Sequence, residues 1–425
     1  MKPDPTSSRQ RYLEKRALAE PWTITGIKRS DYSGAVIIPA CDEERWLFRT
    51  LDSLTANPAS LLNDFLIVVV VNHPKQADHR VKIANRRTLE VFTASPLRNK
   101  LGLGWVDACN PGFEPEAGGV GFARKLGFDL ALSHLRSDID PILVSLDADT
   151  LVDANYLPAI RDHFQKNDRG GAVIPFSHQP ADTMDEQMAI DDYELYLRCY
   201  QLGLTLAGSP YAFHTIGSAF ACRVSAYVGC GGMNRRSGGE DFYFLQALAK
   251  TGGIEPVTGT TVYPAARVSN RVPFGTGPAI RHRRDNPDEA SIYPLAAFEL
   301  LGKWLKLAAA STDLDGVALQ TAATDLDPAL GAFMHRQKLS DTWDRLRRNN
   351  RTKERLNQAF LTWFDGLKTL QLLKQFCRPG QLDLQTAEEA IPCFFEAIGL
   401  VSTGTPTSDL EKLREWQENR NINEK

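Results

Sequence analysis

The chain of 425 residues lacks features that would assign its class at once. Its seven cysteines are scattered, odd in number and never spaced as Cys-x-x-Cys, which excludes a paired-cysteine zinc or redox motif and favours reduced thiols. The formal net charge of -3 gives no electrostatic reason to expect nucleic acid as a partner, since that normally needs a strongly basic face. A small or saccharide substrate fits this composition better.

Long apolar runs are also absent. The longest run, residues 65–71, is far shorter than the roughly 20 residues that a membrane-spanning helix needs, so it predicts a buried strand. The polar first sixteen residues contain no apolar segment of the kind found in a secretory signal. We therefore expect a cytoplasmic protein without a transmembrane segment, and peripheral contact with the inner face of a membrane is compatible with this sequence.

What the chain does contain is an alternation of short β-branched runs and helical stretches from Gly34 onward. Apolar runs at 35–40, 65–71 and 141–146 are separated by amphipathic stretches such as 45–54. Strands that are apolar at nearly every position are expected where both faces of a sheet are buried. The sequence predicts an α/β fold, a Rossmann-like and mostly parallel sheet flanked by helices.

Composition and periodicity divide the chain into four predicted parts. Residues 1–33 form a polar N-terminal arm, residues 34–285 the α/β domain, and residues 404–425 a charged tail. Between them, residues 286–403 show periods near 3.6, which predict an α-helical C-terminal region. Within the arm we expect one short helix at about 10–19.

Two carboxylates stand where the third apolar run stops. Asp147 and Asp149, on either side of Ala148, point the same way if the chain stays extended, and such a pair is repulsive unless a cation lies between its members. Carboxylate oxygens suit Mg²⁺ or Mn²⁺, which bridge to substrate phosphates. The alternative is that Asp149 or Asp153 caps the following helix.

Other polar segments also follow apolar runs. Residues 39–44 and 72–75 stand at the ends of the first two predicted strands, as 147–149 do at the end of the third. Parallel sheets bind ligands at the carboxyl ends of their strands. We therefore expect these segments to converge.

A second acidic pair, Glu240 and Asp241, follows Gly238 and Gly239 at the start of a helical stretch. Acids at a helix start are favoured by the helix dipole, so capping alone accounts for them under one interpretation. Under the other, Asp241 is a general base that takes a proton from an acceptor hydroxyl.

Basic residues near the middle of the chain are candidates for phosphate contact. Arg124 and Lys125 lie in the Gly-rich segment 118–127, which has neither the Gly-x-Gly-x-x-Gly nor the Gly-Lys-Ser/Thr spacing, but they stand near a helix start. A later run is interrupted by glycines that allow a flexible loop, so it suits a lid over a leaving diphosphate, or a solvated basic face. That run comprises Arg267, Arg271, Arg281, His282, Arg283 and Arg284, of which His282 is also a candidate metal ligand.

Taken in order, these motifs resemble the family-2 glycosyltransferases with the GT-A fold, over about residues 34–285. Pro39 to Glu43 is similar to that family's Pro-x-x-Asn-Glu turn, and Asp147 with Asp149 to its Asp-x-Asp site. Residues 123–127 are similar to its Ala-Arg-Asn-x-x-Gly helix start, with Lys for Asn and one residue fewer. Glu240 and Asp241 match its Glu-Asp pair. Four ordered matches are more specific than any one of them.

The chain departs from that family in two places. The family's second strand usually ends in Asp-Asp-Gly-Ser, whose acid reads the nucleotide base, whereas this one ends at Asn72 before His73 and Pro74. Asn72 would make an amide contact instead, which leaves the nucleotide open. The Gln-x-x-Arg-Trp motif of processive members is absent. The region after residue 291 matches no motif of the family.

The resemblance implies an inverting, metal-dependent, hexosyltransferase-like enzyme that moves a sugar from a nucleoside-diphosphate sugar to a glycan, lipid or small-molecule acceptor. Mn²⁺ or Mg²⁺ is the implied cofactor, and Asp241 the implied catalytic base. The remaining implied residues are Pro39, Ala40, Glu43, Asn72, Arg124, Lys125, Asp147, Ala148 and Asp149 for the donor, Gly239 and Glu240 on the acceptor side, Arg271 and Arg281 for the diphosphate lid, and Asp149, Asp147 and His282 for the metal.

Two other functions remain open. One is a degenerate transferase that only binds nucleotide or glycan, which the missing second-strand acid favours and the intact Asp147, Asp149 and Asp241 oppose. The other is a sugar-phosphate nucleotidyltransferase, which would need a Gly-rich segment with Arg and Lys after the first strand. Residues 39–44 lack this.

Overall fold

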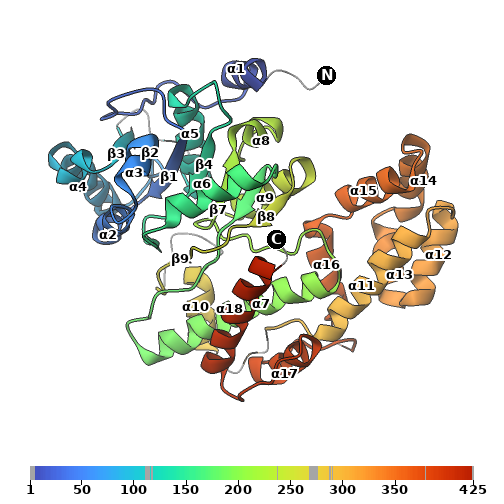
Figure 1. The fold of residues 1–425 in the computed structure, drawn as a ribbon. Helices are drawn as coiled ribbons and strands as arrows, with labels where there is room; N and C mark the ends of the chain where they lie inside the picture. The colour runs from blue at the N-terminus through green and yellow to red at the C-terminus, as the bar shows by residue number, and fades with distance from the viewer. Residues whose placement is uncertain are drawn as a thin grey trace. The chain divides into compact units, whose positions relative to one another are not determined.

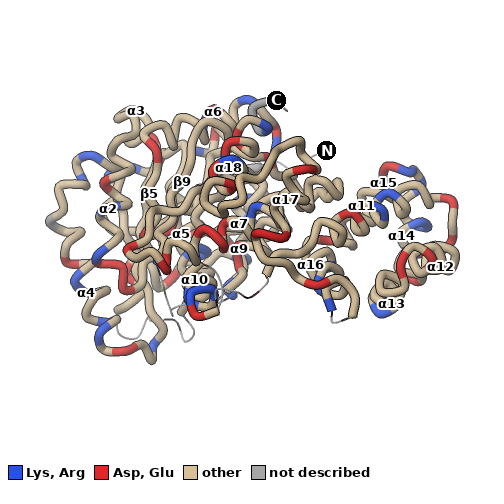
Figure 2. Tube along the Cα trace, turned by 90° about the horizontal axis from the view of Figure 1, so that it is seen from below, with Lys and Arg blue, Asp and Glu red and all other residues tan. Residues whose placement is uncertain are grey.

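The protein is described from a computed structural model, which covers residues 5–110, 115, 118–236, 238–267, 276–286, 289, 291–378 and 380–423 (Figure 1). Contacts group the chain into two compact units. The α/β unit contains Met1–Ile190, Thr215–His282 and Arg414–Lys425, and the helical unit contains Asp191–His214 and Arg283–Leu413. Basic and acidic residues occur in both units (Figure 2), in keeping with the small formal net charge of -3.

Seven strands of the described chain form one sheet in the α/β unit, in the order β3-β2-β1-β4-β7-β6-β8. The first four of these pair in parallel, β7 runs antiparallel to both of its neighbours, and β8 is parallel to β6. The predicted mostly parallel sheet is therefore confirmed. The strands are β1 (Gly34–Ala40), β2 (Phe65–Asn72), β3 (Gly102–Ala108), β4 (Ile142–Ser145), β6 (Gly171–Val173), β7 (Phe220–Arg223) and β8 (Ile254–Pro256).

The centre of this sheet is buried on both faces. Every residue of β1 and β2 is buried, which is why their sequences are apolar at almost every position rather than alternating. Helix α5 (Val120–Ala131) packs directly against both strands. A Cβ atom at Gly127 would lie 2.4 Å from Ile37 Cγ2 and 2.9 Å from Val70 Cγ2, so only glycine allows this close approach.

Further helices complete the α/β unit, and three helices contain residues of both units. A short two-stranded sheet pairs β5 (Leu151–Val152) with β9 (Val262–Tyr263). The further helices are α1 (Pro5–Lys15), α2 (Glu44–Leu54), α3 (Ala59–Asp64), α4 (His79–Ala94), α6 (Tyr156–Lys166), α8 (Val224–Gly229) and α9 (Glu240–Thr251), with 3-10 turns at Pro96–Asn99 and Leu132–His134. The three helices shared between units are α7 (Met184–Leu206), α10 (Thr276–Asp285) and α18 (Pro406–Asn423).

Strand β3 was not predicted, because Gly102, Gly104 and Asp107 interrupt its apolar pattern. The glycines have a packing role. A Cβ at Gly104 would lie 2.6 Å from Ile24 Cγ2, and the N-terminal arm pairs with the strand through Thr25 and Trp105, whose amides donate to each other's carbonyls at 2.8 and 3.0 Å. The arm thus covers the edge strand. Its helix also begins earlier than predicted, at Pro5 rather than near residue 10.

The described part of the helical unit consists of helices and their connections, with one isolated β-bridge between Ile292 and Gln385, and this agrees with its 3.6-residue period. Trp304, Trp343, Phe360 and Phe364 form an aromatic core, with ring centroids 5.7 Å apart between Trp304 and Phe360 and 5.8 Å apart between the stacked Phe360 and Phe364. The helices are α11 (Leu295–Ala310), α12 (Gly316–Leu326), α13 (Pro328–Arg336), α14 (Leu339–Asn349), α15 (Lys353–Trp363), α16 (Gly366–Phe376) and α17 (Ala387–Ala397).

The charged tail after Thr403 contains helix α18, which the sequence did not predict. Asp409 is 2% exposed, and its carboxylate accepts bonds from the Thr403 amide at 2.7 Å and from the Ser402 hydroxyl at 2.5 Å. These bonds fix the start of the helix. No helix in the described part of the chain has the length and apolarity that crossing a membrane requires.

Candidate functional site

The polar segments that follow β1, β2 and β4 converge, as predicted. Strand β1 lies between the other two and runs parallel to both, so the three carboxyl ends lie on one edge. Asn85 of α4 links two of the segments. Its Oδ1 accepts from the Asp42 amide at 2.8 Å, and its Nδ2 donates to the Asn72 carbonyl at 3.0 Å. We call the charged cluster at this edge the strand-end site. It comprises Glu43, Arg124, Asp147, Asp149, Glu240, Asp241 and Arg267.

Arg124 holds the first carboxylate of the Asp-x-Asp motif. From α5, its Nη2 donates to Asp147 Oδ1 and its Nη1 to Glu240 Oε1. The side chains of Arg124 and Glu240 are 3% and 2% exposed, whereas that of Asp147 is 34% exposed. A buried charge is tolerated only when it is paired, and here one arginine neutralises a buried glutamate and reaches a carboxylate that faces solvent.

A glycine on the neighbouring segment makes room for this arginine. A Cβ atom at Gly217 would lie 2.3 Å from Arg124 Nη2 and 2.7 Å from its Cζ. Gly217 also accepts a 2.6 Å bond from the Ser145 hydroxyl at the end of β4. The Arg124 Nε has no hydrogen-bond partner within the described residues. The position of the guanidinium is therefore set by its two carboxylate partners and by Gly217.

Arg267 holds the second carboxylate of the motif. Its Nε and Nη2 donate to Asp149 Oδ2 at 2.8 and 2.6 Å, and its Nη2 also donates to the Glu43 carboxylate at 2.6 and 2.8 Å. Its guanidinium carbon lies 5.3 Å from the Trp46 ring centroid. Burial lowers the pKa of Arg267, but the carboxylates of Asp149 and Glu43 raise it by more, so the group is firmly cationic. Arg267 therefore ties the end of β1 to the end of β4.

Asp241 lies in the first turn of α9, next to the buried Glu240. Gly239, which precedes the helix, has a φ of 68°, in the left-handed region that favours glycine. Burial and the neighbouring Glu240 carboxylate raise the pKa of Asp241 to about 7, against the opposing charge of Arg124. Asp241 Oδ1 accepts a 2.7 Å bond from the Phe242 amide. The half-buried Asp241 thus binds the helix start and is also poised to titrate near neutral pH.

The helix-cap alternative for Asp149 and Asp153 is wrong. Helix α6 is preceded by Asn155, and no side chain caps it. The Asp153 carboxylate instead accepts from the Thr261 amide at 2.8 Å and from the Tyr263 hydroxyl at 3.1 Å, beside the β5–β9 pair. Asp149 binds Arg267, as described above. Both carboxylates therefore make tertiary contacts rather than local ones.

The remaining predicted donor residues lie at or near this edge. Pro39 and Ala40 end β1, where they pair with Val70 and Val71. The buried Ala148 accepts a 2.9 Å bond from the Thr50 hydroxyl through its carbonyl. Asn72 is 3% exposed, and its Nδ2 donates to the Gly119 carbonyl at 3.3 Å. That bond uses the Nδ2 group of the side chain that the sequence assigned to contact with the nucleotide base.

Lys125 is directed into a separate network. Its Nζ lies 2.8 Å from Asp129 Oδ2 and donates to the Tyr12 hydroxyl at 2.9 Å. The same Asp129 accepts from the Tyr12 and Tyr227 hydroxyls at 2.8 and 2.7 Å and from the Leu18 amide at 2.7 Å. These contacts fasten the N-terminal arm to α5, so a donor-binding role for Lys125 stays a prediction.

The predicted lid is described only in part. Arg271 lies outside the described residues. Arg281 and His282 lie in α10, which begins at Thr276. Within the ranges that the structure describes, no cluster of three or more His, Cys, Asp or Glu side chains could hold a metal ion. His282 is therefore not part of such a cluster there. The lid and the His282 ligand stay predictions.

A metal at this edge would rely on the Asp-x-Asp pair. Mg²⁺ in enzymes is commonly held by one or two carboxylates together with waters and substrate phosphates. Asp147 and Asp149, whose side chains are 34% and 21% exposed, have the oxygen chemistry and the solvent access for this. The residues present therefore fit a divalent cation that is shared with a phosphate ligand.

Some residues of the site were missed or misplaced by the sequence interpretation. Arg267 was included in the basic run assigned to a lid, but the structure places it on Asp149 and Glu43. Asn85 and Trp46 were not singled out. Asn85 is a polar residue of the helix that follows the apolar strand β2, and Trp46 is an aromatic residue that follows the Pro-x-x-x-Glu turn, so both were visible in the sequence. Gly217, 93 positions after Arg124 on the chain, carried no local signal.

No family model matches the chain, and neither does any curated protein sequence. Solved glycosyltransferase structures are among those to which the chain is similar. One is S. aureus TarS 1-349 in complex with UDP-GlcNAc, at 14% identity over 84% of this chain and 98% of that chain, with a TM-score of 0.39. Another is the mannosyltransferase PcManGT from Pyrobaculum calidifontis in complex with GDP-Man and Mn²⁺, at 18% identity over 84% and 94%, with a TM-score of 0.36.

A third similar structure is that of S. aureus TarS at its greater length, at 15% identity and a TM-score of 0.34. This match covers 55% of the present chain and 36% of TarS, so the chain spans little more than a third of that protein. Identities and TM-scores of this size leave the function to be inferred from the residues of the strand-end site.

Proposed function

We propose that the chain is a glycosyltransferase that moves a sugar from a nucleoside-diphosphate sugar to an acceptor hydroxyl. The observation that carries this proposal is the strand-end site itself. It gathers two arginines, the Asp-x-Asp carboxylates and an acid with a pKa near 7 at the edge of a parallel sheet where ligands bind. These are the groups needed to hold a diphosphate and to remove a proton.

Arg267 is suited to stabilise the leaving diphosphate. Its Nε and Nη2 bind Asp149 and Glu43, while its Nη1 has no partner within the described residues. A guanidinium offers five N–H donors and matches phosphate oxygens well. With its side chain 21% exposed, Arg267 keeps donors for an incoming diphosphate. Negative charge that develops on the diphosphate as the glycosidic bond breaks would thus meet a fixed cation.

Asp241 is suited to act as the general base. A base works best when its pKa lies near the working pH, and burial together with Glu240 raises the pKa of Asp241 to about 7. The acceptor oxygen attacks the anomeric carbon as Asp241 takes its proton, and the bond to the diphosphate oxygen breaks in the same step. A single displacement of this kind inverts the configuration of the sugar.

Asp147 and Asp149 are the residues that would hold Mn²⁺ or Mg²⁺. A bound ion would supply charge neutralisation to the diphosphate. In the structure Arg124 and Arg267 neutralise these two carboxylates. The two aspartates are therefore held in place before the substrate binds. A glycan, lipid or small-molecule acceptor and a cytoplasmic location remain predictions from the sequence.

A protein that only binds nucleotide is the second candidate. The observation in its favour is that each Asp-x-Asp carboxylate already has an arginine partner, which satisfies the pair without a metal. The two candidates differ in chemistry. A transferase hydrolyses its donor sugar slowly when the acceptor is absent, whereas a binding protein releases it intact.

Thermal shift with UDP and GDP, with and without Mn²⁺, tests the donor site. At about 100 times its Kd, a nucleotide that binds the native state stabilises it by about 2.7 kcal/mol. We expect one nucleotide to raise the midpoint by several degrees in the wild type with Mn²⁺. Asp149→Asn should lose most of this shift, because it removes a carboxylate that would hold the ion.

Asp52→Asn is the matched control, since Asp52 is an exposed carboxylate of α2 outside the strand-end site. It should keep the full nucleotide shift. If neither nucleotide moves the wild-type midpoint under any metal condition, the donor-site proposal is wrong. If a nucleotide binds but a screen of its sugar esters shows no hydrolysis, the binding-only candidate takes its place.

A further inference from the structure

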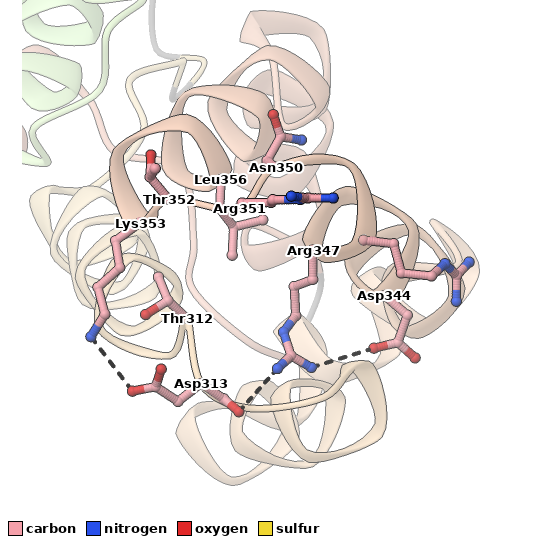
Figure 3. A pocket seen from close by; sticks show the side chains of 10 residues that line it. Thr312, Asp313, Asp344, Arg347, Asn350, Arg351, Thr352, Lys353 and Leu356 are labelled. Atoms are coloured by element: carbon pink, nitrogen blue, oxygen red, sulfur yellow. Dashed lines mark hydrogen bonds and ion pairs between the residues drawn. The ribbon is translucent and has the colours of Figure 1, made fainter.

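A cleft of about 500 Å³ lies within the helical unit, outside the strand-end site (Figure 3). It is formed by the loop between α11 and α12, the end of α14 and the start of α15. We call it the α14–α15 cleft. Its lining residues are Thr312, Asp313, Asp344, Arg347, Arg348, Asn350, Arg351, Thr352, Lys353 and Leu356.

The acidic residues of the cleft are already engaged. Asp344 Oδ1 accepts a 2.8 Å bond from the Gly316 amide, at the start of α12, and lies 4.0 Å from Arg347 Nη1. Asp313 Oδ2 lies 3.5 Å from Lys353 Nζ. Figure 3 shows Arg347 between these two acids, with its Nη2 donating to the Asp313 carbonyl at 3.3 Å. The Asp344 carboxylate therefore serves the fold, whereas Asp313 forms an exposed surface pair with Lys353.

Two of the cationic residues are left over. Arg348 and Arg351 are exposed, and neither side chain makes an ion pair or a hydrogen bond with any residue that the structure describes. The lining thus carries four cationic side chains, against two carboxylates that already have partners. An excess of unpaired guanidinium groups around a hollow favours an anionic ligand, because guanidinium binds phosphate oxygens through parallel N–H donors.

Two neutral features of the cleft point to a ligand as well. Thr312 is 8% exposed, and its buried Oγ1 has no hydrogen-bond partner within the described chain. A buried hydroxyl normally has a partner, so this one has bonding capacity to spare. The first turn of α15 also begins at the cleft wall, where Thr352 caps it by accepting from the Arg355 amide. The positive end of that helix adds to the attraction for an anion.

We infer that the α14–α15 cleft binds a small phosphate-bearing molecule, through Arg348 and Arg351. The size of the hollow lies within the range of about 300 to 1,000 Å³ that is typical of small-molecule sites. A nucleic-acid surface would instead be broad and uniformly basic. Here Asp313 and Asp344 stand between the cations, which would repel a long phosphate backbone. The ligand is free phosphate, pyrophosphate or a phosphorylated sugar, and these share the group that the arginines recognise.

Hydrogen exchange combined with calorimetric titration tests the inference in the full-length chain. We expect pyrophosphate to bind more tightly than inorganic phosphate, to lose affinity as salt is added, and to protect the amides of residues 345–356. Tighter binding of a hexose phosphate than of phosphate would identify the sugar ester as the ligand. Protection confined to the strand-end segments, such as 147–149, would refute the inference and leave the donor-site proposal untouched.

The matched variants separate the two unpaired arginines from the general charge of α14. Arg348→Ala and Arg351→Ala should each weaken pyrophosphate binding roughly tenfold, as the loss of one charge-assisted contact implies. Arg345→Ala removes an exposed arginine of the same helix that does not line the cleft, and it should change the affinity by less than about twofold. The inference is wrong if the Arg345 variant loses as much as the other two, or if only a duplex RNA probe binds.

Discussion

The strand-end site and the α14–α15 cleft place arginines in opposite circumstances. At the strand ends, Arg124 is 3% exposed and is bonded to two carboxylates. In the cleft, Arg348 and Arg351 are exposed and have no described partner. A buried pair that loses one member leaves an uncompensated charge, whereas an exposed arginine is solvated whether or not it is paired. The same residue type should therefore govern stability in one place and only binding in the other.

The largest expected effect is on the stability of the α/β unit in Arg124→Met. The substitution keeps an apolar side chain of similar length but leaves Glu240, which is 2% exposed, as a buried and unpaired charge. Breaking such a pair costs about 3 to 5 kcal/mol, so the thermal midpoint should fall by about 10 °C. Differential scanning calorimetry measures it.

Arg136→Met provides the control for that change. Arg136 pairs with Asp138 at 2.6 Å, and their side chains are 40% and 66% exposed. Its loss should cost less than about 1 kcal/mol. Equal losses in the two variants would mean that burial does not distinguish the strand-end arginine, and the comparison would fail.

The next effect concerns Asp241→Asn and depends on pH. The folded-state pKa of Asp241, about 7, lies above the ordinary value of 3.8. Between pH 3.8 and pH 7 the folded chain therefore binds more protons than the unfolded chain, so the wild type loses stability as the pH rises through this range. Asparagine does not titrate. The variant should therefore gain on the order of 1 to 2 kcal/mol over the wild type between pH 5 and pH 8, since water beside a half-buried carboxyl weakens the effect.

Urea denaturation of both proteins across that pH range measures the gain, with Asp52→Asn as the baseline. A stability difference that stays constant with pH would show that Asp241 does not titrate there. If donor turnover is found, the same Asn variant should lose about 10² to 10⁴ of the transfer rate, and the wild-type rate should rise with pH towards a plateau above about 7.

The smallest effect is expected for stability when both cleft arginines are removed. Substitution of exposed residues without partners usually changes the free energy of unfolding by less than about 0.5 kcal/mol. The double variant of Arg348→Ala and Arg351→Ala should keep the wild-type thermal midpoint within about 2 °C. A drop as large as that of Arg124→Met would mean that the cleft arginines support the fold, contrary to the comparison.

Much of the α/β architecture was predictable because its signals are local. The apolar runs of β1 and β2 predicted strands buried on both faces, and the structure buries every residue of both. Strand β3 was missed because Gly102 and Gly104 look like breaks in a sequence, although in the structure Gly104 makes room for Ile24 of the N-terminal arm and Gly102 for the Phe65 carbonyl. Helix α18 was missed because its start is fixed by the bonds of Asp409 to Ser402 and Thr403 rather than marked by an apolar period.

By itself the sequence determined that polar groups would end parallel strands and that the Asp-x-Asp carboxylates would lie at one edge of the sheet. It determined this because an apolar run that fills a buried strand is a local signal. The expected side-chain alternation of an extended segment did not apply, because β4 ends at Ser145 and Ala148 and Asp149 lie in a turn. Only the tertiary structure decided which charge pairs with which. Arg267 meets Asp149 across 118 positions and Glu43 across 224, and Arg124 meets Glu240 across 116. Burial and the space that glycines leave determine such partners, and neither produces a signal in the neighbouring sequence.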